Sequence, residues 1–317
     1  MSKKRILVTG GAGFIGSHLV QHLLKQNWEV SVLDNCCVGN KLCPDTIARI
    51  NFIQADIRDY PTVLAATKNC DAIVHFAALV GVDEVINQPI DTIEIEVVGT
   101  QNIGKAARIN GVKKVIYASS SAVYKNTLNK MSHESDQLDL VNDYAIAKRL
   151  NEVYLQSITT ETGMPTCSLR FFNIYGMRQD SRMVIPRFFE QAFNDEPILV
   201  FGDGQQTRDF THVDDVIGAI SRLLIHQNVP GIFNVARGHE TTILELAQMV
   251  KQVTNSKSTV QLLDFPEKRL DYKVNKRVGN PEKLFQHIGF KPSITLQNGL
   301  TAYAQKLRKA SLELVKI

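Results

Sequence analysis

Short apolar runs alternate with amphipathic stretches through the first half of the chain. Apolar positions recur at the spacing of one helix face, most clearly over 14–26, 92–109 and 143–162. Alternation of strands with helices predicts a parallel sheet that is covered by helices on both faces, so the predicted fold class is α/β. The expected strands, each rich in β-branched or aromatic residues, lie at 5–9, 29–34, 51–55, 72–77, 114–119 and 166–172.

The pattern becomes less regular after residue 172. The expected elements there are helices at 183–194 and 214–226 and strands at 198–201, 231–235 and 259–264. A chain of 317 residues can form one or two domains, and no repeat or low-complexity linker divides this one. We expect a first domain of residues 1–172, to which 209–236 return. Residues 173–208 and 237–317 are expected to form a smaller C-terminal α/β domain that binds the substrate.

Composition narrows the classes of partner. The chain carries 36 basic and 32 acidic residues, a balance that does not favour a nucleic-acid partner. No apolar run has the length of a membrane span, and the start of the chain lacks a signal-peptide core, so we expect a cytoplasmic protein. The five cysteines are odd in number and are expected to be free thiols. Cys36, Cys37 and Cys43 lack the further ligands of a metal site, so no metal is predicted.

A glycine-rich turn, VTGGAGFIG, joins the first strand to the first helix. Gly10, Gly13 and Gly16 have the spacing of a dinucleotide-binding turn of the Rossmann type. The N–H groups at the start of the helix would bind the pyrophosphate. Asp34 ends the second strand, where it can accept hydrogen bonds from the adenosine ribose. Because Asn35 rather than an arginine follows it, we expect NAD rather than NADP.

Other strand ends supply further contacts at the same edge of the sheet. Asp56 and Ile57 follow the third strand and are expected to hold the adenine. The stretch HFAA (75–78) ends the fourth strand, where ligands meet open α/β sheets. His75 is expected to be a packed residue rather than a base or a metal ligand.

A tyrosine and a lysine in NDYAIAKRL share one helix face near three serines that end the fifth strand. Tyr144 and Lys148 are four residues apart, and the serines are Ser119, Ser120 and Ser121. A phenol with an ordinary pKa near ~10 needs help to act as a base at neutral pH. A nearby ammonium and a positively charged nicotinamide would both favour the phenolate. Tyr144 is therefore the predicted base, and a serine hydroxyl would bind the substrate oxygen.

The chain resembles the extended short-chain dehydrogenase/reductase family, and within it the nucleotide-sugar epimerases typified by UDP-galactose 4-epimerase. The resemblance covers essentially the full length and rests on motifs that follow the order of that family. They are TGGAGFIG, LDN, DIRD, SSSAVY, YAIAK, RFFNIYG, TRDFTHVDD and the stretch around PEKR. It implies NAD as the cofactor, a nucleotide-diphosphate sugar as the substrate, and a homodimer formed through helices near 92–109 and 143–162.

The resemblance also assigns individual residues. It implies that Ser120 is the catalytic serine, that Tyr144 is the base, and that Lys148 also holds the nicotinamide ribose. Phe172 would pack against the nicotinamide, and Arg208 and Arg269 would hold the diphosphate, which suits the fixed fork of arginine donors. Further implied contacts are, for NAD, Phe14, Ile15, Asn35, Phe76, Ala77, Ala78 and Ser119, and, for the nucleotide sugar, Ser120, Ser121, Asn173, Val200 and Phe201.

Three positions bear on the reaction. Relatives that eliminate water or carbon dioxide generally carry an acid where this chain has Ala122, so simple epimerisation is favoured. Asp180 stands where glucuronate epimerases have an arginine, which favours a neutral hexose or N-acetylhexosamine. Glu96 replaces the usual asparagine of the family, and it either alters the proton relay or faces solvent.

The leading hypothesis is an NAD-dependent epimerase that inverts carbon 4 of a UDP-hexose or UDP-N-acetylhexosamine through a transient 4-keto sugar. A reductase or dehydratase of the same family is the alternative enzyme, and a non-catalytic protein that binds NAD or a nucleotide sugar is a third reading. The sequence leaves open which base and which sugar are bound.

Overall fold

Seven parallel strands form the central sheet of the protein. The structure is a computed structural model that describes residues 3–124, 130–226, 228–266 and 274–314. All seven strands agree with the ranges expected from the sequence to within one residue, except that β4 ends two residues earlier. In sheet order they are β11 (Gly231–Val235), β6 (Thr166–Phe171), β5 (Lys114–Ser120), β4 (Ala72–His75), β1 (Arg5–Thr9), β2 (Glu29–Asp34) and β3 (Asn51–Gln54).

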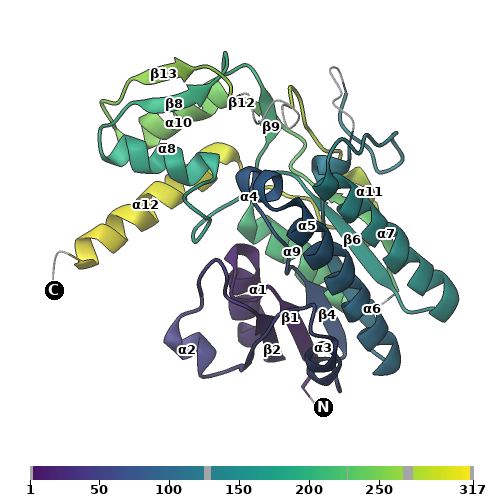
Figure 1. The fold of residues 1–317 in the computed structure, drawn as a ribbon. Coiled ribbons are helices and arrows are strands. Elements are labelled where there is room, and N and C mark those ends of the chain that lie inside the picture. Colours follow the sequence, from purple (N-terminus) through teal and green to yellow (C-terminus); the bar gives the residue numbers. More distant parts are fainter. Residues whose placement is uncertain (1–2, 125–129, 227, 267–273, 315–317) are drawn as a thin grey trace.

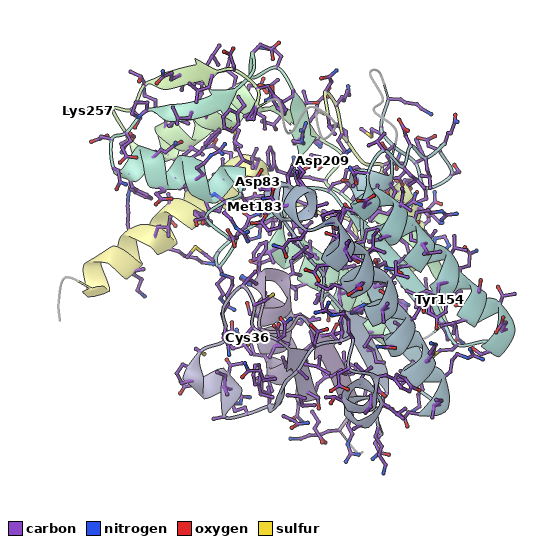
Figure 2. All side chains as sticks on the ribbon, in the orientation of Figure 1. Cys36, Asp83, Tyr154, Met183, Asp209 and Lys257 are labelled. Carbon is purple, nitrogen blue, oxygen red and sulfur yellow. The ribbon has the colours of Figure 1, made fainter. Side chains whose placement is uncertain are left out.

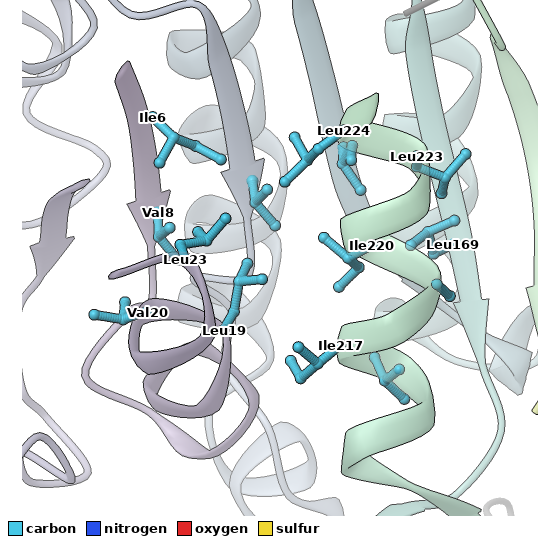
Figure 3. Close-up of a cluster of buried hydrophobic side chains, with 14 of the residues drawn as sticks. Ile6, Val8, Leu19, Val20, Leu23, Leu169, Ile217, Ile220, Leu223 and Leu224 are labelled. Atoms are coloured by element: carbon cyan, nitrogen blue, oxygen red, sulfur yellow. The ribbon is translucent and has the colours of Figure 1, made fainter. Parts of the chain in front are cut away.

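Helices cover both faces of this sheet, as Figure 1 shows. On β1, Ile6 and Val8 point to one face and Leu7 to the other, because side chains alternate along a strand. Figure 3 shows the first face, where side chains of α1 lie beside Ile6 and Val8 and those of α9 lie beside Leu169 in the same apolar cluster. The helices of that face are α1 (Phe14–Lys25), α9 (Val213–Ile225) and α11 (Glu282–Ile288); the opposite face carries α3 (Tyr60–Ala66), α6 (Gly99–Ile109) and α7 (Asp143–Thr162).

The helix before β5 contains a wide turn. α5 (Pro89–Ile93), the π-helical turn η1 (Glu94–Val98) and α6 follow one another without leaving helical backbone geometry. Turns of this kind are rare and frequently occur at functional sites. The combined helix packs against α7, which begins after the capping side chain of Asn142 and ends at Gly163 with φ 74°.

A smaller group of elements lies at the upper left of Figure 1. Its apolar core contains Phe188, Phe189, Leu246 and Tyr303. It consists of α8 (Val184–Phe193), β8 (Ile198–Phe201), α10 (Ile243–Thr254), β13 (Val260–Leu263) and α12 (Leu296–Leu314). The boundaries between the two domains stay a prediction.

Short elements connect this group to the main sheet. Asp83 on α4 and Met183 just before α8 are labelled in Figure 2, and their neighbours Glu84 and Arg182 form an ion pair. α4 therefore contacts the segment that leads into α8. The remaining elements are α2 (Pro44–Ile47), α4 (Val82–Asn87), η2 (Ser121–Val123), the parallel pair β7 (Ile174–Tyr175) and β10 (Thr211–His212), and the antiparallel pair β9 (Thr207–Asp209) and β12 (Glu240–Thr242).

Within the described residues, no helix combines the length and the apolar character that crossing a membrane requires.

Candidate active site

The candidate site lies along the carboxyl edge of the central sheet, where ligands bind in open α/β folds. The turn after β1 requires glycine at two positions. Gly10 has φ +65°, and a Cβ there would lie 2.6 Å from the backbone nitrogen of Ala77. A Cβ on Gly16 would lie 2.2 Å from the carbonyl oxygen of Gly10. The backbone thus forms a tight cradle that no larger residue could form.

The helix after this cradle presents its amino end to the sheet edge. Gly13 is the N-cap of α1, and Phe14 and Ile15 open its first turn. The first N–H groups of a helix have no partner within the helix and favour an anion. The cradle and the helix start therefore fit the pyrophosphate of a dinucleotide.

Asp34 is fixed beside the cradle by backbone groups. Its Oδ2 accepts a hydrogen bond from the N–H of Ala12 at 2.9 Å, and its Oδ1 accepts one from Cys36 at 2.8 Å. Each carboxylate oxygen keeps a further lone pair for a ribose hydroxyl. Asn35, the next residue, is exposed and donates from Nδ2 to Asp56 at 3.4 Å.

Asp56 is paired and Ile57 is packed at the end of β3. Arg58 donates to both oxygens of Asp56 at 3.0 Å, and these hydrogen bonds lower the pKa of the Asp56 carboxyl. The Ile57 side chain is buried, and it packs so closely against Gly99 that a Cβ at that position would collide with it. Asp56 thus has a position and a charge suited to the adenine amino group, whereas the Ile57 side chain has little surface left for a ligand.

Residues after β4 line the cradle. Phe76, Ala77 and Ala78 are partly exposed, and the N–H of Ala77 lies 3.4 Å from the Thr9 hydroxyl. His75 is fully buried, with Nδ1 2.6 Å from the Thr9 hydroxyl and Nε2 3.1 Å from that of Thr100. The expectation that His75 is a packed residue is therefore confirmed.

Ser120 and Tyr144 meet between β5 and α7. The Ser120 oxygen accepts a hydrogen bond from the N–H of Ala122 at 3.1 Å, and the Ser120 side chain also hydrogen bonds the phenol of Tyr144. Burial raises the pKa of Tyr144, whereas the charge of Lys148 and the Ser120 hydrogen bond both act to lower it. The structure thus brings together the serine, tyrosine and lysine that the sequence predicted.

Lys148 forms a buried ion pair with Glu96. Its Nζ lies 2.9 Å from Glu96 Oε2, donates to the carbonyl oxygen of Ala118 at 3.0 Å, and lies 5.3 Å from the centre of the Tyr144 ring. Both charged side chains are buried. Of the two alternatives for Glu96, exposure to solvent is therefore excluded, because η1 turns this side chain inward.

Two of the three serines are less available than expected. The Ser119 hydroxyl donates to Glu152 Oε1 at 2.6 Å, and Glu152 also pairs with the buried Arg170. Ser121 is buried in the short helix that follows β5. The Ser119 hydroxyl thus holds the core together rather than facing a cofactor, which corrects the expectation for its side chain.

The Phe172 ring, which was expected at the nicotinamide, lies on the buried side of the strand end. Phe172 is fully buried among Val123, Tyr124 and Ala236, and a Cβ on Gly279 would collide with its ring. A ring that is enclosed in this way has no face left for a nicotinamide, so the expectation for Phe172 is wrong. Phe171, the last residue of β6, points to the opposite face and is partly exposed.

The part of the site nearest the smaller group of elements contains Asn173 and Arg208, two of the polar residues expected there. Asn173 is exposed, with the uncommon φ of 33°. The Arg208 guanidinium donates to the carbonyl oxygens of Thr207 and Val274 at 2.7 and 2.8 Å. Phe201 is partly exposed beneath Arg187, whose guanidinium lies 5.2 Å from the ring centre.

Two expectations on this side change or remain open. Val200 is fully buried in the core of the smaller group, so the expectation that it contacts substrate is wrong. Arg269, the second arginine expected at the diphosphate, lies outside the described residues.

The structure adds an arginine that the sequence reasoning missed. Burial lowers the pKa of Arg277, and the charge of Arg208 lowers it further, so the two cations lie close together. Within the described part of the chain, neither guanidinium pairs with a carboxylate. Two desolvated cations without an acid form a site for an anion. The signal in the sequence was Arg277, the single arginine of the stretch LDYKVNKRVGN, to which the resemblance assigned no role.

Comparison with known proteins places the chain in a family. Residues 6–236 match the NAD dependent epimerase/dehydratase family. A UDP-N-acetyl-alpha-D-glucosaminuronate decarboxylase of Bacillus cytotoxicus is 35% identical over 97% of this chain and 98% of its own length.

Solved structures of two related enzymes share the whole fold. The UDP-N-acetylglucosamine 4-epimerase of Methanobrevibacter ruminantium, in complex with UDP-N-acetylmuramic acid, has a TM-score of 0.90 and 30% identity over 98% of this chain and all of its own. The UDP-glucose 4-epimerase of Thermus thermophilus, in complex with NAD, has a TM-score of 0.88 and 30% identity over 96% of this chain and 99% of its own. Together with the glycine cradle and Asp34, these matches show that this chain belongs to the NAD-dependent epimerase/dehydratase family and that NAD is its cofactor.

Proposed function

We propose that this protein inverts carbon 4 of a UDP-hexose or UDP-N-acetylhexosamine. The observation that carries this proposal is the hydrogen-bonded pair of Ser120 and Tyr144, with Ala122 rather than an acid beside it. A single phenol that takes and returns one proton is sufficient for epimerisation. An elimination would need a further acid or base, and Ala122 offers none.

The residues of the site have separate roles in this reaction. Ser120 binds the 4-hydroxyl of the sugar and orients its proton toward the Tyr144 phenolate, which removes it. Bound NAD supplies the acceptor and donor of the hydride. Tyr144 then returns the proton after the 4-keto sugar has turned its other face to the cofactor. Lys148 favours the phenolate form in which Tyr144 starts the reaction and to which it returns once the proton is given back.

Binding of the nucleotide part is assigned to the cationic side of the site. Arg208 and Arg277 would neutralise the diphosphate, and Asn173 would donate to one of its oxygens. Phe171 replaces Phe172 as the residue that we expect to contact the nicotinamide. Arg269 keeps the role that the resemblance implies for it.

A second candidate is decarboxylation of a UDP-uronate, the chemistry named for the Bacillus relative. Asp180 was expected to repel a sugar carboxylate, but Arg182 donates to Asp180 at 2.7 Å and also contacts Glu84. A cation is therefore present on this loop. Two acids share it, however, so the local charge is still negative, and we favour the neutral sugar.

Incubation of the purified protein with a panel of sugars separates the two reactions. The panel contains UDP-glucose, UDP-N-acetylglucosamine, UDP-glucuronate and UDP-N-acetylglucosaminuronate, and NMR identifies the products. Epimerisation yields the 4-epimer of a neutral sugar. Release of carbon dioxide from a uronate, without conversion of the neutral sugars, would replace our proposal with the second candidate.

We also propose that the protein is a cytoplasmic homodimer. All five cysteines are free, as suits a reducing compartment. On α7, Ile146, Leu150 and Val153 share one face and are each more than 40% exposed. Ile90 and Ile93 on the adjoining α5 extend this apolar surface. A second copy of the chain would cover it, as large exposed apolar patches usually mark interfaces.

A further inference from the structure

Glu96 is a buried carboxylate that no step of the proposed reaction uses. Oε2 lies 2.9 Å from Lys148 Nζ and accepts a hydrogen bond from the Tyr117 hydroxyl at 3.3 Å. Oε1 is buried and has no hydrogen-bond partner. The Glu96 backbone carbonyl accepts a hydrogen bond from Asn151 at 2.9 Å, which fixes η1 against α7. Burial raises the pKa of the Glu96 carboxyl, and the charge of Lys148 is the main influence that lowers it, so the ion pair is the contact that maintains the Glu96 charge.

The pair changes what Lys148 can do for the phenol. Burial alone would lower the pKa of Lys148, but the Glu96 carboxylate raises it above its ordinary value, so Lys148 stays charged. The positive charge is matched by a negative one only 2.9 Å away. Tyr144 therefore experiences an ion pair rather than a lone cation, and an ion pair stabilises a phenolate far less.

Groups on the neighbouring elements supply no further positive charge to Tyr144. From β4, His75 is neutral because burial lowers its pKa to about 3. From β5, burial raises the pKa of Tyr117, so its phenol also stays neutral. From α7, Asn151 carries no charge and donates to Tyr117 at 2.9 Å. Glu96 and Lys148 are therefore the charged pair that acts on Tyr144 from within the protein.

We propose that Glu96 is a positioning residue that acts through Lys148 and keeps Tyr144 in its phenol form until NAD and substrate are bound. This inference rests on the role proposed above for Tyr144. The pyridinium charge of the cofactor then becomes the main cation that favours the phenolate. The phenol then loses its proton to solvent, so the base is formed only when the hydride acceptor is in place, and the enzyme with an empty site does not hold a free phenolate.

The test compares the ionisation of Tyr144 in Glu96→Gln with that in the wild-type protein, each as purified with its NAD. The rise of tyrosinate ultraviolet absorbance with pH is recorded, and the curve of a matching protein that also carries Tyr144→Phe is subtracted, so that Tyr144 alone remains. Gln keeps the shape of the side chain and can still accept from Lys148. We expect Tyr144 of Glu96→Gln to ionise at a pH lower by about one unit or more, because the cation is no longer matched. The pH profile of kcat/KM should shift in the same direction.

Glu94→Gln is the matched control. Glu94 lies two residues away on η1, is 53% exposed and contacts Arg58 rather than Lys148. The same change from carboxylate to amide at Glu94 should leave the Tyr144 titration and the pH profile of kcat/KM unchanged. A purely structural role for Glu96 predicts a lower melting temperature with an unchanged Tyr144 titration, and that outcome in a folded Glu96→Gln protein overturns the inference.

Two further measurements test the inference even if Glu96→Gln does not fold. Glu96→Asn, which shortens the side chain, is expected to shift the titration in the same direction. In the wild type freed of its NAD, burial should keep the ionisation of Tyr144 above the ordinary phenol value of ~10, and ionisation well below that value would overturn the inference. The titration needs no turnover. An enzyme that converts none of the sugars but shows the shift would refute the proposed function and leave this inference standing.

Discussion

Tyr144 and Lys148 lie one turn apart on α7, and the Lys148 ammonium is 5.3 Å from the centre of the Tyr144 ring. The spacing of four residues in the sequence guarantees a shared helix face but not a shared function. The structure adds the two contacts that distinguish a site from a surface pair. Ser120 hydrogen bonds the phenol, and Glu96 holds the ammonium inside the protein.

The first prediction concerns the phenol. Tyr144→Phe removes the proton acceptor but keeps the ring, so turnover should fall roughly 10²–10⁴-fold while the fold and the NAD content survive. Tyr154→Phe is the control. Tyr154 lies on the same helix, and its hydroxyl donates to the carbonyl oxygen of Gln101, so its loss should leave turnover unchanged. Wild-type epimerisation rates in Tyr144→Phe would refute the mechanism.

Removal of the lysine is a less direct test of the same chemistry. Lys148→Met leaves Glu96 buried without its partner, and breaking a buried pair in this way typically costs about 3–5 kcal/mol. A loss of activity in that variant would therefore combine misfolding with lost chemistry. The double variant Lys148→Met with Glu96→Gln removes both charges, and it should recover much of the stability but not the activity.

The second prediction concerns the choice of cofactor. Asp34 is held at the ribose position by Ala12 and Cys36, and its charge would repel a 2′-phosphate. The purified protein should therefore bind NAD more tightly than NADP, as measured by calorimetry. Asp34→Asn should reduce the preference for NAD over NADP. Asp45→Asn, on the exposed start of α2, should leave that preference unchanged. Equal binding of NADP by the wild type would contradict this role of Asp34.

The glycine turn and the strand ends could be predicted from the sequence because their chemistry is local. Gly10 and Gly16 are required by backbone geometry within one turn, and Asp34 follows from its place at the end of a strand. Phe171 and Phe172 show where this reasoning fails. Neighbouring residues at a strand end point to opposite sides, so an error of one residue exchanges a partly exposed ring for a fully buried one.

Residues whose roles depend on distant partners could not be assigned from the sequence. Glu96 and Lys148 are 52 residues apart by their numbering, and η1 decides whether that carboxylate faces inward. The role of Arg277 depends on its proximity to Arg208, which lies on β9 far away in the sequence. Val200 was expected at the substrate, but the alternation of β8 points it into the core. Tertiary packing determines which partners these residues meet, and no periodicity along the chain identifies those partners.

The third prediction concerns the diphosphate. Arg208→Ala and Arg277→Ala should each weaken UDP binding by about 1.5–3 kcal/mol, the usual value of a charge-assisted contact, without loss of NAD. Calorimetric titration with UDP measures the effect. Arg222→Ala, on the exposed side of α9, is the control that should bind like the wild type. Unchanged UDP affinity in both site variants would place the diphosphate elsewhere, and Arg269→Ala would then be examined next.

The fourth prediction concerns assembly. A charge introduced into the apolar face of α7, as in Leu150→Glu, should convert the dimer to monomer in sedimentation experiments, because it would be desolvated in the interface. Ile225→Glu is the control, since Ile225 is also exposed but ends α9 on the opposite face of the sheet. A wild-type protein that sediments as a monomer at micromolar concentration would contradict the proposed dimer.

The fifth prediction concerns stability in acid. Burial, helped by the charge of Lys148, lowers the pKa of His75 from 6.5 in the unfolded chain to about 3 in the folded protein. Above pH 6.5 His75 is neutral in both states and adds no pH dependence. As the pH falls below 6.5, the unfolded chain takes up a proton that the folded protein does not, so the free energy of unfolding decreases by about 1.4 kcal/mol per pH unit from this group. Between pH 6.5 and about pH 5 the loss should reach about 2 kcal/mol.

Urea unfolding of the wild type and of His75→Asn at about pH 7 and about pH 5 isolates this contribution, because asparagine does not titrate. The variant should have a lower free energy of unfolding at neutral pH, since it loses the contacts to Thr9 and Thr100, but it should lose about 2 kcal/mol less on acidification. His226→Asn, at the exposed end of α9, should keep the wild-type pH dependence. Parallel curves for the wild type and His75→Asn would show that His75 does not take part in acid destabilisation.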